Sequence, residues 1–426
     1  MVDVDFSPRP QTALRPGWYS RRRLLLGLLA SALTAACAEP PPPIPTASPS
    51  PQPSPIPSPS PRTGPPLIVP SPSPSPVPAL GRPGLLTVER DGRILLVDPE
   101  RQQPVKTLVG SPDNAAPRWS PDGRSILFVQ GIGPAAELRL ISAGDGIERR
   151  LTSNSRPERG AVWSPRGDQI AYTLPRAVGP GGADDPGSPE EVWLLDVQTG
   201  TDRKLVDGFD PAWSPDGRRL AYASNGERNE RGPGNNAIRV VGADGQGDRQ
   251  VLAMSDLPPD LLPTYGLPFS PGTLRLRAPA WSPDGQRIVA SADGHTSMAL
   301  TFDERGQGLR PWALAYEGGV GIARWSPDGS RLAIESQPAT GVDVVVVVDL
   351  ANQHEVPIGG PSVGFKAFGP TWAPDGRRLA VVVGKPPGRR DDPPESALRL
   401  FDLAGAALSD LIAEPGLEQP DWGRAP

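Results

Sequence analysis

One short phrase, Trp-Ser-Pro-Asp-Gly with small variations, recurs six times between residues 117 and 376. The tryptophans of successive copies are 44, 50, 68, 44 and 47 residues apart, which is the period of a four-stranded propeller blade. Alternating apolar residues follow each copy, for example at Arg219 to Tyr222 and Arg331 to Ile334, as expected of half-buried strands. The repeat therefore predicts an all-β fold in which similar blades are arranged around an axis.

The residue types within the phrase suit a strand that ends in a tight turn. Proline presets φ for its turn position and glycine takes the positive φ that follows. The aspartates invite a calcium or acid–base interpretation, but Arg166 replaces one of them while the phrase persists, which favours turn stability. The aromatic ring is large enough to fill the wedge between neighbouring blades. We expect a structural role for Trp119, Trp163, Trp213, Trp281, Trp325, Trp372 and Trp422.

The phrase followed by Arg-Leu-Ala, as at Trp213 to Ala221, resembles the TolB-type (PD40) propeller repeat, which is related in architecture to WD repeats. The resemblance covers residues 85–426, and taken alone it implies six blades. Counting strands favours seven blades. Residues 85–108 supply strands of a blade that lacks its tryptophan-bearing strand, and Gln419 to Trp422 form a tryptophan-bearing strand that lacks a blade. We expect residues 84–426 to form a seven-bladed β-propeller, with six blades as the alternative, closed by its N- and C-terminal strands.

The N-terminal segment has the pattern of an export signal. Arg21, Arg22 and Arg23 precede an apolar stretch, 24–36, that is too short to span a bilayer as a helix. Small residues then lead to Cys37, the only cysteine, and the segment resembles both a lipoprotein lipobox and a twin-arginine signal. We expect 1–36 to be a signal peptide, exported by the twin-arginine or the general route, and Cys37 to carry lipid.

Residues 37–83 are rich in proline and serine after the cysteine and hold almost no large apolar residue. Such a composition forms no core and favours an extended polyproline spacer. Together with the lipid anchor, it predicts a protein held on the extracytoplasmic side of a membrane, in the periplasm or at the cell surface.

Charge and composition exclude several classes of function. The net charge is −5, and because residues 1–36 hold five Arg against two Asp, or +3, the remainder carries −8; such an acidic chain is not expected to bind nucleic acid. Two His and one Cys are too few for a His/Cys zinc, haem or iron–sulfur site. We therefore expect no cofactor and no such metal, although oxygen-ligated calcium stays open.

Catalytic motifs are weak throughout the chain. Gly360 to Gly364 fits the nucleophile-elbow pattern, but it lies between blades without a strand–turn–helix context. His295 follows Asp293 and Gly294 in a turn, where a lone imidazole is more often a turn residue than a base. No catalytic residue is assigned on this basis.

The longest departures from the repeat indicate a recognition face. Leu174 to Glu191, Asn225 to Asn236 and Lys385 to Ser396 would join the second and third strands of a blade, and Met254 to Arg277 would join two blades. In a propeller these two kinds of connection share one face, and insertions on one rim commonly carry recognition. The candidate binding residues in these segments are charged or aromatic: Asp184, Asp185, Arg228, Arg231, Tyr265, Phe269, Arg389 and Arg390.

These features predict a lipid-anchored, monomeric and noncatalytic scaffold that binds an extracytoplasmic protein or polysaccharide. The alternative is a propeller hydrolase or lyase that acts on an envelope or extracellular polymer through carboxylates in the central channel. Such a site leaves no linear signature, so the two interpretations are distinguished by which charged groups the fold brings together.

Overall fold

The computed structural model describes residues 83–131, 133–154, 156–175, 190–225, 236–258, 275–294, 296–316, 319–337, 343–359, 366–384, 396–403 and 407–424. The proposed signal peptide, Cys37 and the Pro/Ser spacer lie outside these residues, so they stay predictions. Within the described part of the chain, no helix is long and apolar enough to cross a membrane.

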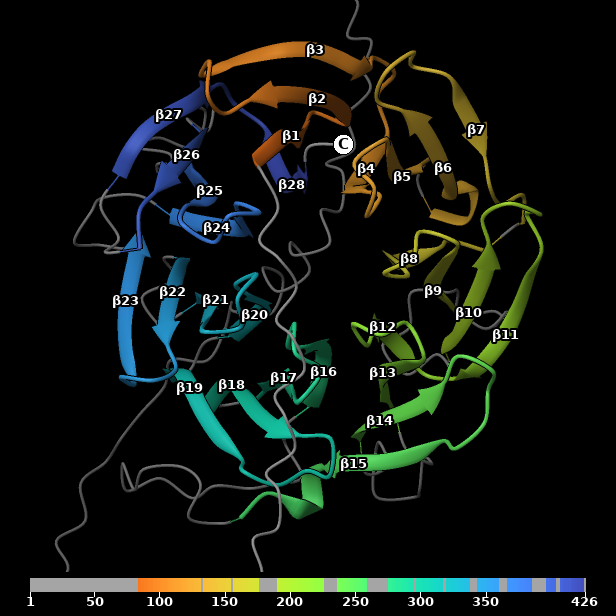
Figure 1. Ribbon diagram of the computed structural model, residues 1–426, viewed down its shortest axis with the longest axis vertical. Helices are drawn as coiled ribbons and strands as arrows, with labels where there is room; N and C mark the ends of the chain where they lie inside the picture. Colours follow the sequence, from red (N-terminus) through yellow and green to blue (C-terminus); the bar gives the residue numbers. More distant parts are fainter. Residues whose placement is uncertain are drawn as a thin grey trace, which may run out of the picture. The chain divides into compact units, whose positions relative to one another are not determined.

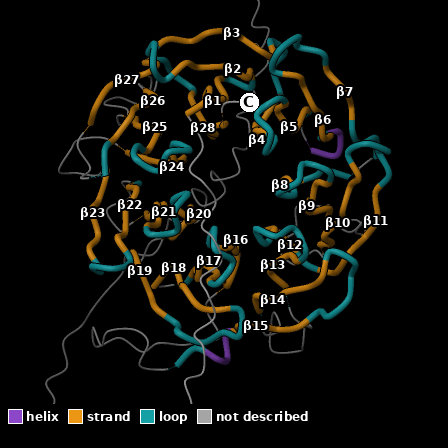
Figure 2. Tube along the Cα trace, viewed as in Figure 1, coloured by secondary structure: helices purple, strands orange, loops and turns teal. Residues whose placement is uncertain are grey.

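Seven four-stranded antiparallel sheets surround a central axis (Figures 1 and 2). Blades 1 to 3 are β4 (Asn114–Trp119), β5 (Ser125–Gln130), β6 (Glu137–Ser142) and β7 (Glu148–Arg150); β8 (Arg159–Trp163), β9 (Gln169–Pro175), β10 (Glu190–Asp196) and β11 (Asp202–Asp207); and β12 (Phe209–Trp213), β13 (Arg219–Ser224), β14 (Ala237–Gly242) and β15 (Arg249–Ala253). Blades 4 and 5 are β16 (Arg275–Trp281), β17 (Arg287–Asp293), β18 (Thr296–Asp303) and β19 (Arg310–Tyr316); and β20 (Gly319–Trp325), β21 (Arg331–Gln337), β22 (Val344–Asp349) and β23 (His354–Gly359).

Blade 6 is β24 (Lys366–Trp372), β25 (Leu379–Gly384), β26 (Ser396–Phe401) and β27 (Ala407–Ala413), and blade 7 is β28 (Leu417–Arg424), β1 (Pro83–Arg90), β2 (Arg93–Asp98) and β3 (Gln103–Val109). Two short 3₁₀ helices, η2 (Gly133–Ala135) and η3 (Met254–Asp256), complete the described elements. The prediction of an all-β, seven-bladed propeller is confirmed, and six blades is excluded.

The two ends of the propeller chain meet in blade 7. Strand β28 pairs with β1 in an antiparallel register that places Leu86 opposite Trp422. The Trp422 indole Nε1 donates to the Gly84 carbonyl at 3.1 Å, and the Thr87 hydroxyl donates to the Asp421 carbonyl at 3.3 Å. The last strand therefore supplies the innermost strand of a blade whose other three strands come from residues 83–109, as the strand count predicts.

Six of the repeat tryptophans end their innermost strands, Trp422 lies just before the end of β28, and all seven pack between blades. Trp281 of blade 4, for example, lies in one buried cluster with Phe209 and Ala221 of blade 3. The guanidinium of Arg219 also covers the Trp281 ring, 5.0 Å from its centroid, an arrangement that adds a cation–π attraction to the burial. The tryptophans are therefore structural, as expected from their place in the repeat.

The turn aspartates hold the turns together. In blade 1 the Ser120 hydroxyl donates to Asp122 at 2.6 Å, and the same carboxylate accepts the Arg124 backbone N–H at 3.1 Å. In blade 2, where Arg166 replaces the turn aspartate, the Ser164 hydroxyl donates at 2.6 Å to Asp168 instead. A carboxylate two positions along the chain thus takes over the bond, which explains why the phrase tolerates arginine.

Candidate functional site

Antiparallel pairing fixes which connections share a face of the ring. The Trp-Ser-Pro-Asp-Gly turns and the turns between third and fourth strands lie on one face, called here the turn face. The opposite face, called here the insertion face, holds the first residues of the innermost strands and the last residues of the second strands. The strand ends that flank all four long departures from the repeat lie on this insertion face. The candidate residues Asp184, Asp185, Arg228, Arg231, Tyr265, Phe269, Arg389 and Arg390 themselves lie outside the described residues.

A β-bulge recurs in the innermost strands, three residues before the tryptophan. Six of the seven positions have positive φ, from 47° to 61°, and the pairing register with the second strand shifts beside them. These positions are Ala116, Gly160, Asp210, Ala278, Gly369 and Gln419. Because a bulge disrupts the local ladder and bends the strand, it leaves backbone N–H groups that other partners must satisfy.

Carboxylates of neighbouring blades supply several of these partners. Asp210 of blade 3 accepts the Ala278 N–H of blade 4 at 3.1 Å, and Glu335 of blade 5 accepts the Gly369 N–H of blade 6 at 2.8 Å. Asp421 accepts the Trp119 N–H across the closure at 2.8 Å. These three acids bind one blade to the next.

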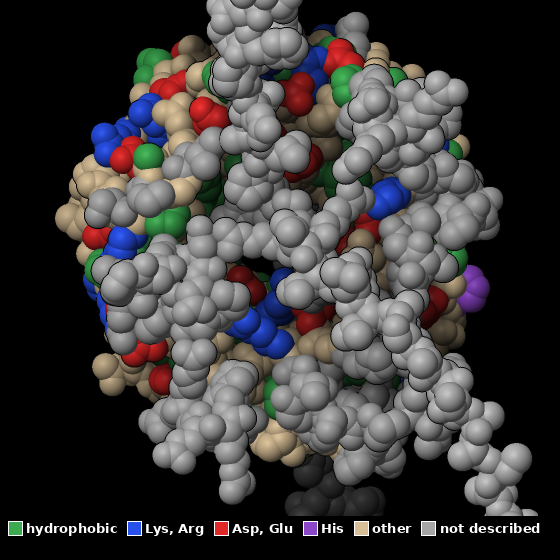
Figure 3. Space-filling view, turned by 180° about the vertical axis from the view of Figure 1, so that it is seen from behind, with side chains coloured by type: hydrophobic (Ala, Val, Ile, Leu, Met, Phe, Trp, Pro, Cys, Tyr) green, Lys and Arg blue, Asp and Glu red, His purple; other side chains and the backbone are tan. Residues whose placement is uncertain are grey.

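The acids at this face gather with arginines around blades 2 to 5. Arg277 pairs with the buried Asp293, whose other oxygen accepts the Val320 N–H of blade 5 at 3.3 Å. Figure 3, which shows the ring from behind, has acidic and basic side chains side by side around a central hollow. Charged side chains that cluster in a hollow are a candidate site for binding or chemistry.

Arg275, at the start of β16, is held by neutral partners. Its guanidinium lies over the Phe209 ring, 5.1 Å from the centroid, and Nη2 donates to the Asn225 side-chain oxygen at 2.9 Å. No carboxylate among the described residues forms an ion pair with it. The side chain is half-buried, so its charge is fixed in place without a direct counter-charge.

Glu190, at the start of β10, is the carboxyl of this group without a hydrogen-bond partner among the described residues. Its backbone carbonyl accepts the Gly208 N–H at 2.9 Å, which places Glu190 beside Phe209 and Asp210. Burial, and then the negative charge of Asp210, raise the pKa of Glu190 to about 7. Arg159 and Arg275 act in the opposite direction. A half-buried carboxyl that titrates near neutrality can exchange a proton at physiological pH.

Other acids near this face have raised pKa values but are committed to the structure. Burial raises the pKa of Asp210 and of Glu335, even though their backbone N–H partners lower it. Burial also raises the pKa of Glu158, just before β8, to about 7, against hydrogen bonds from neighbours such as Asn154. One Glu158 oxygen has no partner within the described structure. Burial is therefore the common cause of these shifts.

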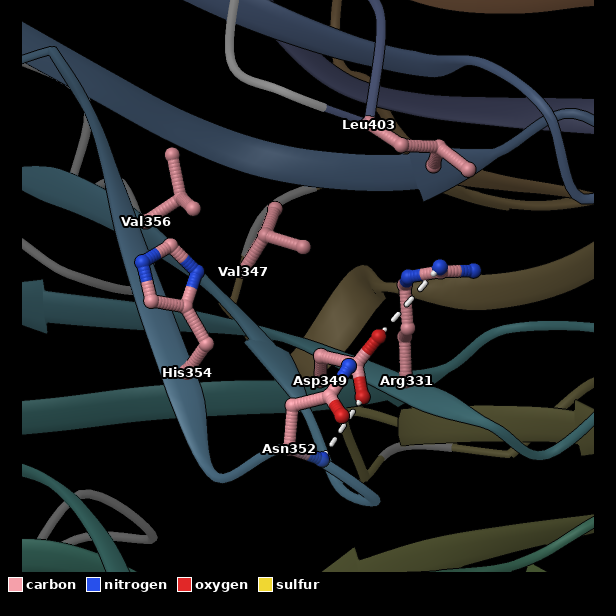
Figure 4. A pocket seen from close by; sticks show the side chains of 7 residues that line it. All are labelled: Arg331, Val347, Asp349, Asn352, His354, Val356 and Leu403. Atoms are coloured by element: carbon pink, nitrogen blue, oxygen red, sulfur yellow. Dashed lines mark hydrogen bonds and ion pairs between the residues drawn. The ribbon is translucent and has the colours of Figure 1, made fainter.

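Two open pockets between neighbouring blades lie on the turn face. One, of about 360 Å³, is lined by Arg331, Val347, Asp349, Asn352, His354, Val356 and Leu403 (Figure 4). Asp349 is already paired with Arg331 at 3.3 Å and caps the turn through the Asn352 N–H at 3.1 Å. The His354 side chain is exposed. With its acid and arginine engaged with each other, this pocket is a weaker candidate than the charged hollow.

The described residues contain no group of three or more His, Cys, Asp or Glu side chains that could hold a metal ion. His295 and the Gly360 to Gly364 motif lie outside the described residues. The sequence predicts a site on the insertion face but does not single out Glu190, Asp210, Arg275 and Arg277 as a group, since they come from three blades and share no linear motif.

No protein-family model matches the chain. Two curated proteins are similar to part of it: the uncharacterized peptidase YuxL of Bacillus subtilis, 31% identical over 147 residues (27% of this chain, 22% of that protein), and the Tol-Pal system protein TolB of Gluconobacter oxydans, 30% identical over 109 residues (25% and 23%). The similarity thus spans less than a quarter of the length of either relative.

Among solved structures, TolB from Acinetobacter baumannii has a TM-score of 0.45 at 16% identity and covers 79% of this chain and 81% of its own. An oligogalacturonate lyase in complex with manganese has a TM-score of 0.49 at 15% identity, covering 78% and 85%. Seven four-stranded sheets built on recurring Trp-Ser-Pro-Asp-Gly turns make this chain a seven-bladed β-propeller, and its repeat resembles the TolB type.

Proposed function

We propose that this chain is an extracytoplasmic, lipid-anchored scaffold that binds a protein or glycan through the insertion face of its propeller. The segment 1–83 would export the protein, attach it to a membrane through Cys37 and hold the propeller away from the bilayer. The charged side chains of Glu190, Asp210 and Arg275 on the insertion face would form the base of the binding site, and the long connections would surround it.

The observation that carries this proposal is the placement of Glu190, Arg275 and Asp210 on the face that also receives the four long departures from the repeat. Rigid strands position these groups, because Asp210 is bonded to blade 4 at 3.1 Å and Arg275 is held by Phe209 and Asn225. Recognition sites on rigid scaffolds usually combine polar side chains held by rigid strands with long connecting loops beside them.

A second candidate function, hydrolysis or lysis of an envelope or extracellular polymer, is favoured by one observation. The pKa of Glu190 is raised to about 7 beside a second carboxyl and two arginines, and a carboxyl poised near neutrality suits general acid or base chemistry. Against it, Asp210 is engaged as a backbone acceptor between blades. Binding is therefore the preferred function.

Capture from detergent-solubilised envelope extracts tests the proposal. The full chain would be compared with a variant carrying Glu190→Gln and Arg275→Gln, and with a control carrying Arg166→Gln and Arg218→Gln on the turn face. Both control arginines are exposed. We expect the insertion-face variant to lose the captured component and the control to retain it. Equal capture by all three proteins would refute the assignment of this face, and polymer cleavage that Glu190→Gln abolishes would favour the enzyme.

A further inference from the structure

We propose that the insertion face binds a carboxylate group of its ligand on Arg275, and that the ligand binds there only when Glu190 is protonated. This inference rests on the proposed binding function and narrows it to one chemical group. Arg275, Phe209 and Asn225 form the receptor, and Glu190 is the group that competes with the ligand for it.

The receptor part of the inference follows from how Arg275 is held. Most arginines of the described ring that lie near acids are paired with them, as Arg277 is with Asp293 and Arg331 with Asp349. Arg275 is instead oriented by an aromatic ring at 5.1 Å and by an amide oxygen at 2.9 Å. Neutral partners leave its charge uncompensated at short range. A planar guanidinium fixed in this way matches a carboxylate, which it can bind through two parallel hydrogen bonds.

The charges around Arg275 strengthen the preference for an anion. Arg159, on β8, and Arg277, on β16, contribute to the same electrostatic environment. On the acidic side, Asp293 is paired with Arg277, and Asp210 is engaged as the acceptor of the Ala278 N–H. When Glu190 is protonated, the three guanidinium groups of Arg159, Arg275 and Arg277 therefore outnumber the two carboxylates of Asp210 and Asp293.

Glu190 is the group that can reverse this balance. The charged groups that act on its carboxyl are Asp210 on β12, Arg159 on β8 and Arg275 on β16. When Glu190 is ionised, its negative charge acts on Arg275 and repels an incoming carboxylate. When it is protonated, that repulsion disappears and its hydroxyl becomes a donor that can hydrogen-bond the bound anion. Binding should therefore take up about one proton at pH 8 and almost none at pH 6.

The size of the coupling follows from the titration of Glu190. With a pKa of about 7, roughly nine-tenths of the chains carry the proton at pH 6 and about one-tenth at pH 8. Because the apparent dissociation constant scales inversely with the competent fraction, affinity for a carboxylate should fall about tenfold between these two pH values.

The test is calorimetric titration of the full chain in detergent with succinate at pH 6 and pH 8, at constant ionic strength. Succinamide serves as the neutral analogue and sulfate as an oxyanion of different shape. We expect saturable binding of succinate, about tenfold tighter at pH 6, and none of succinamide. Glu190→Gln should bind at pH 8 as the wild type does at pH 6, and Arg275→Gln should weaken binding at least about tenfold at pH 6.

Arg166→Gln on the turn face is the matched control, and thermal melting of each variant checks that the propeller is intact. Binding of succinate that is unaffected by Arg275→Gln, or a Glu190→Gln variant that keeps the pH dependence, would overturn the inference. Sulfate bound more tightly than succinate would overturn the carboxylate preference. If succinate does not bind while the insertion-face variant still loses its envelope ligand, the inference fails and the proposed function stands.

Discussion

Trp422→Ala tests whether the last strand holds the ring closed. The side chain is 7% exposed and packs with Leu86 of β1 and Leu398 of blade 6. Removing a buried tryptophan side chain costs about 3 to 5 kcal/mol. Loss of the Nε1 bond to the Gly84 carbonyl adds roughly 1 kcal/mol. The total of about 4 to 6 kcal/mol is a large fraction of a typical folding free energy of about 5 to 15 kcal/mol.

The measurement is thermal and urea denaturation followed by far-ultraviolet circular dichroism, with Arg424→Ala as a control on an exposed side chain of the same strand. We expect a single transition whose midpoint falls by roughly 10 °C for Trp422→Ala and hardly at all for the control. Deleting residues 419–426 should destabilise the whole propeller. A loss below about 1 kcal/mol for Trp422→Ala, in the range of surface substitutions, would show that the ring does not depend on this closure.

Three further predictions concern one turn, the closure of the ring and one buried acid. Asp168→Ala should destabilise by about 1 to 2 kcal/mol in denaturant melts, because it removes the acceptor of the Ser164 hydroxyl in the one turn that has arginine; no change would show that this carboxylate is not the replacement. Gly423→Ala should destabilise by more than 1 kcal/mol, since an added Cβ would lie 2.6 Å from the Trp119 ring, and a neutral effect would contradict the close packing at the closure. The pKa of Glu158 is raised from 4.5 to about 7 in the folded chain. The contribution of this shift to the free energy of unfolding is therefore fully present below pH 4.5 and is lost as pH rises through 7. The wild type should therefore lose up to roughly 3 kcal/mol between pH 5 and pH 8 relative to Glu158→Gln; parallel stability curves would refute this.

The fold could be predicted because its determinants repeat along the chain. Each copy of the phrase carries its own turn residues and its own tryptophan to pack between neighbouring blades. The position of Trp281 or Trp372 in the fold can therefore be predicted without knowledge of the other blades. The closure was also readable, since the unmatched strands at 85–108 and at Trp422 complement each other. The replacement of the turn acid by Asp168 was missed, because the bond depends on the side-chain geometry of a single turn.

The candidate site could be predicted only as a face. Strand alternation decides which connections share a rim, and this follows from the order of the strands alone. In the proposed receptor, Arg275 contacts Phe209 and Asn225, which lie 50 or more positions before it in the chain. No spacing rule connects residues so far apart. The raised pKa of Glu190 likewise arises from burial and from Asp210 in the next blade, which sequence patterns do not report.

Site-specific photocrosslinking tests most directly whether the insertion face is the functional one. A photoreactive residue would replace either Gln337, exposed at the end of β21 on the insertion face, or Arg218, exposed on the turn face. Each full-length variant would be irradiated in intact cells. We expect a discrete adduct from position 337 and none from position 218. Adducts from position 218 alone would contradict it and assign recognition to the turn face.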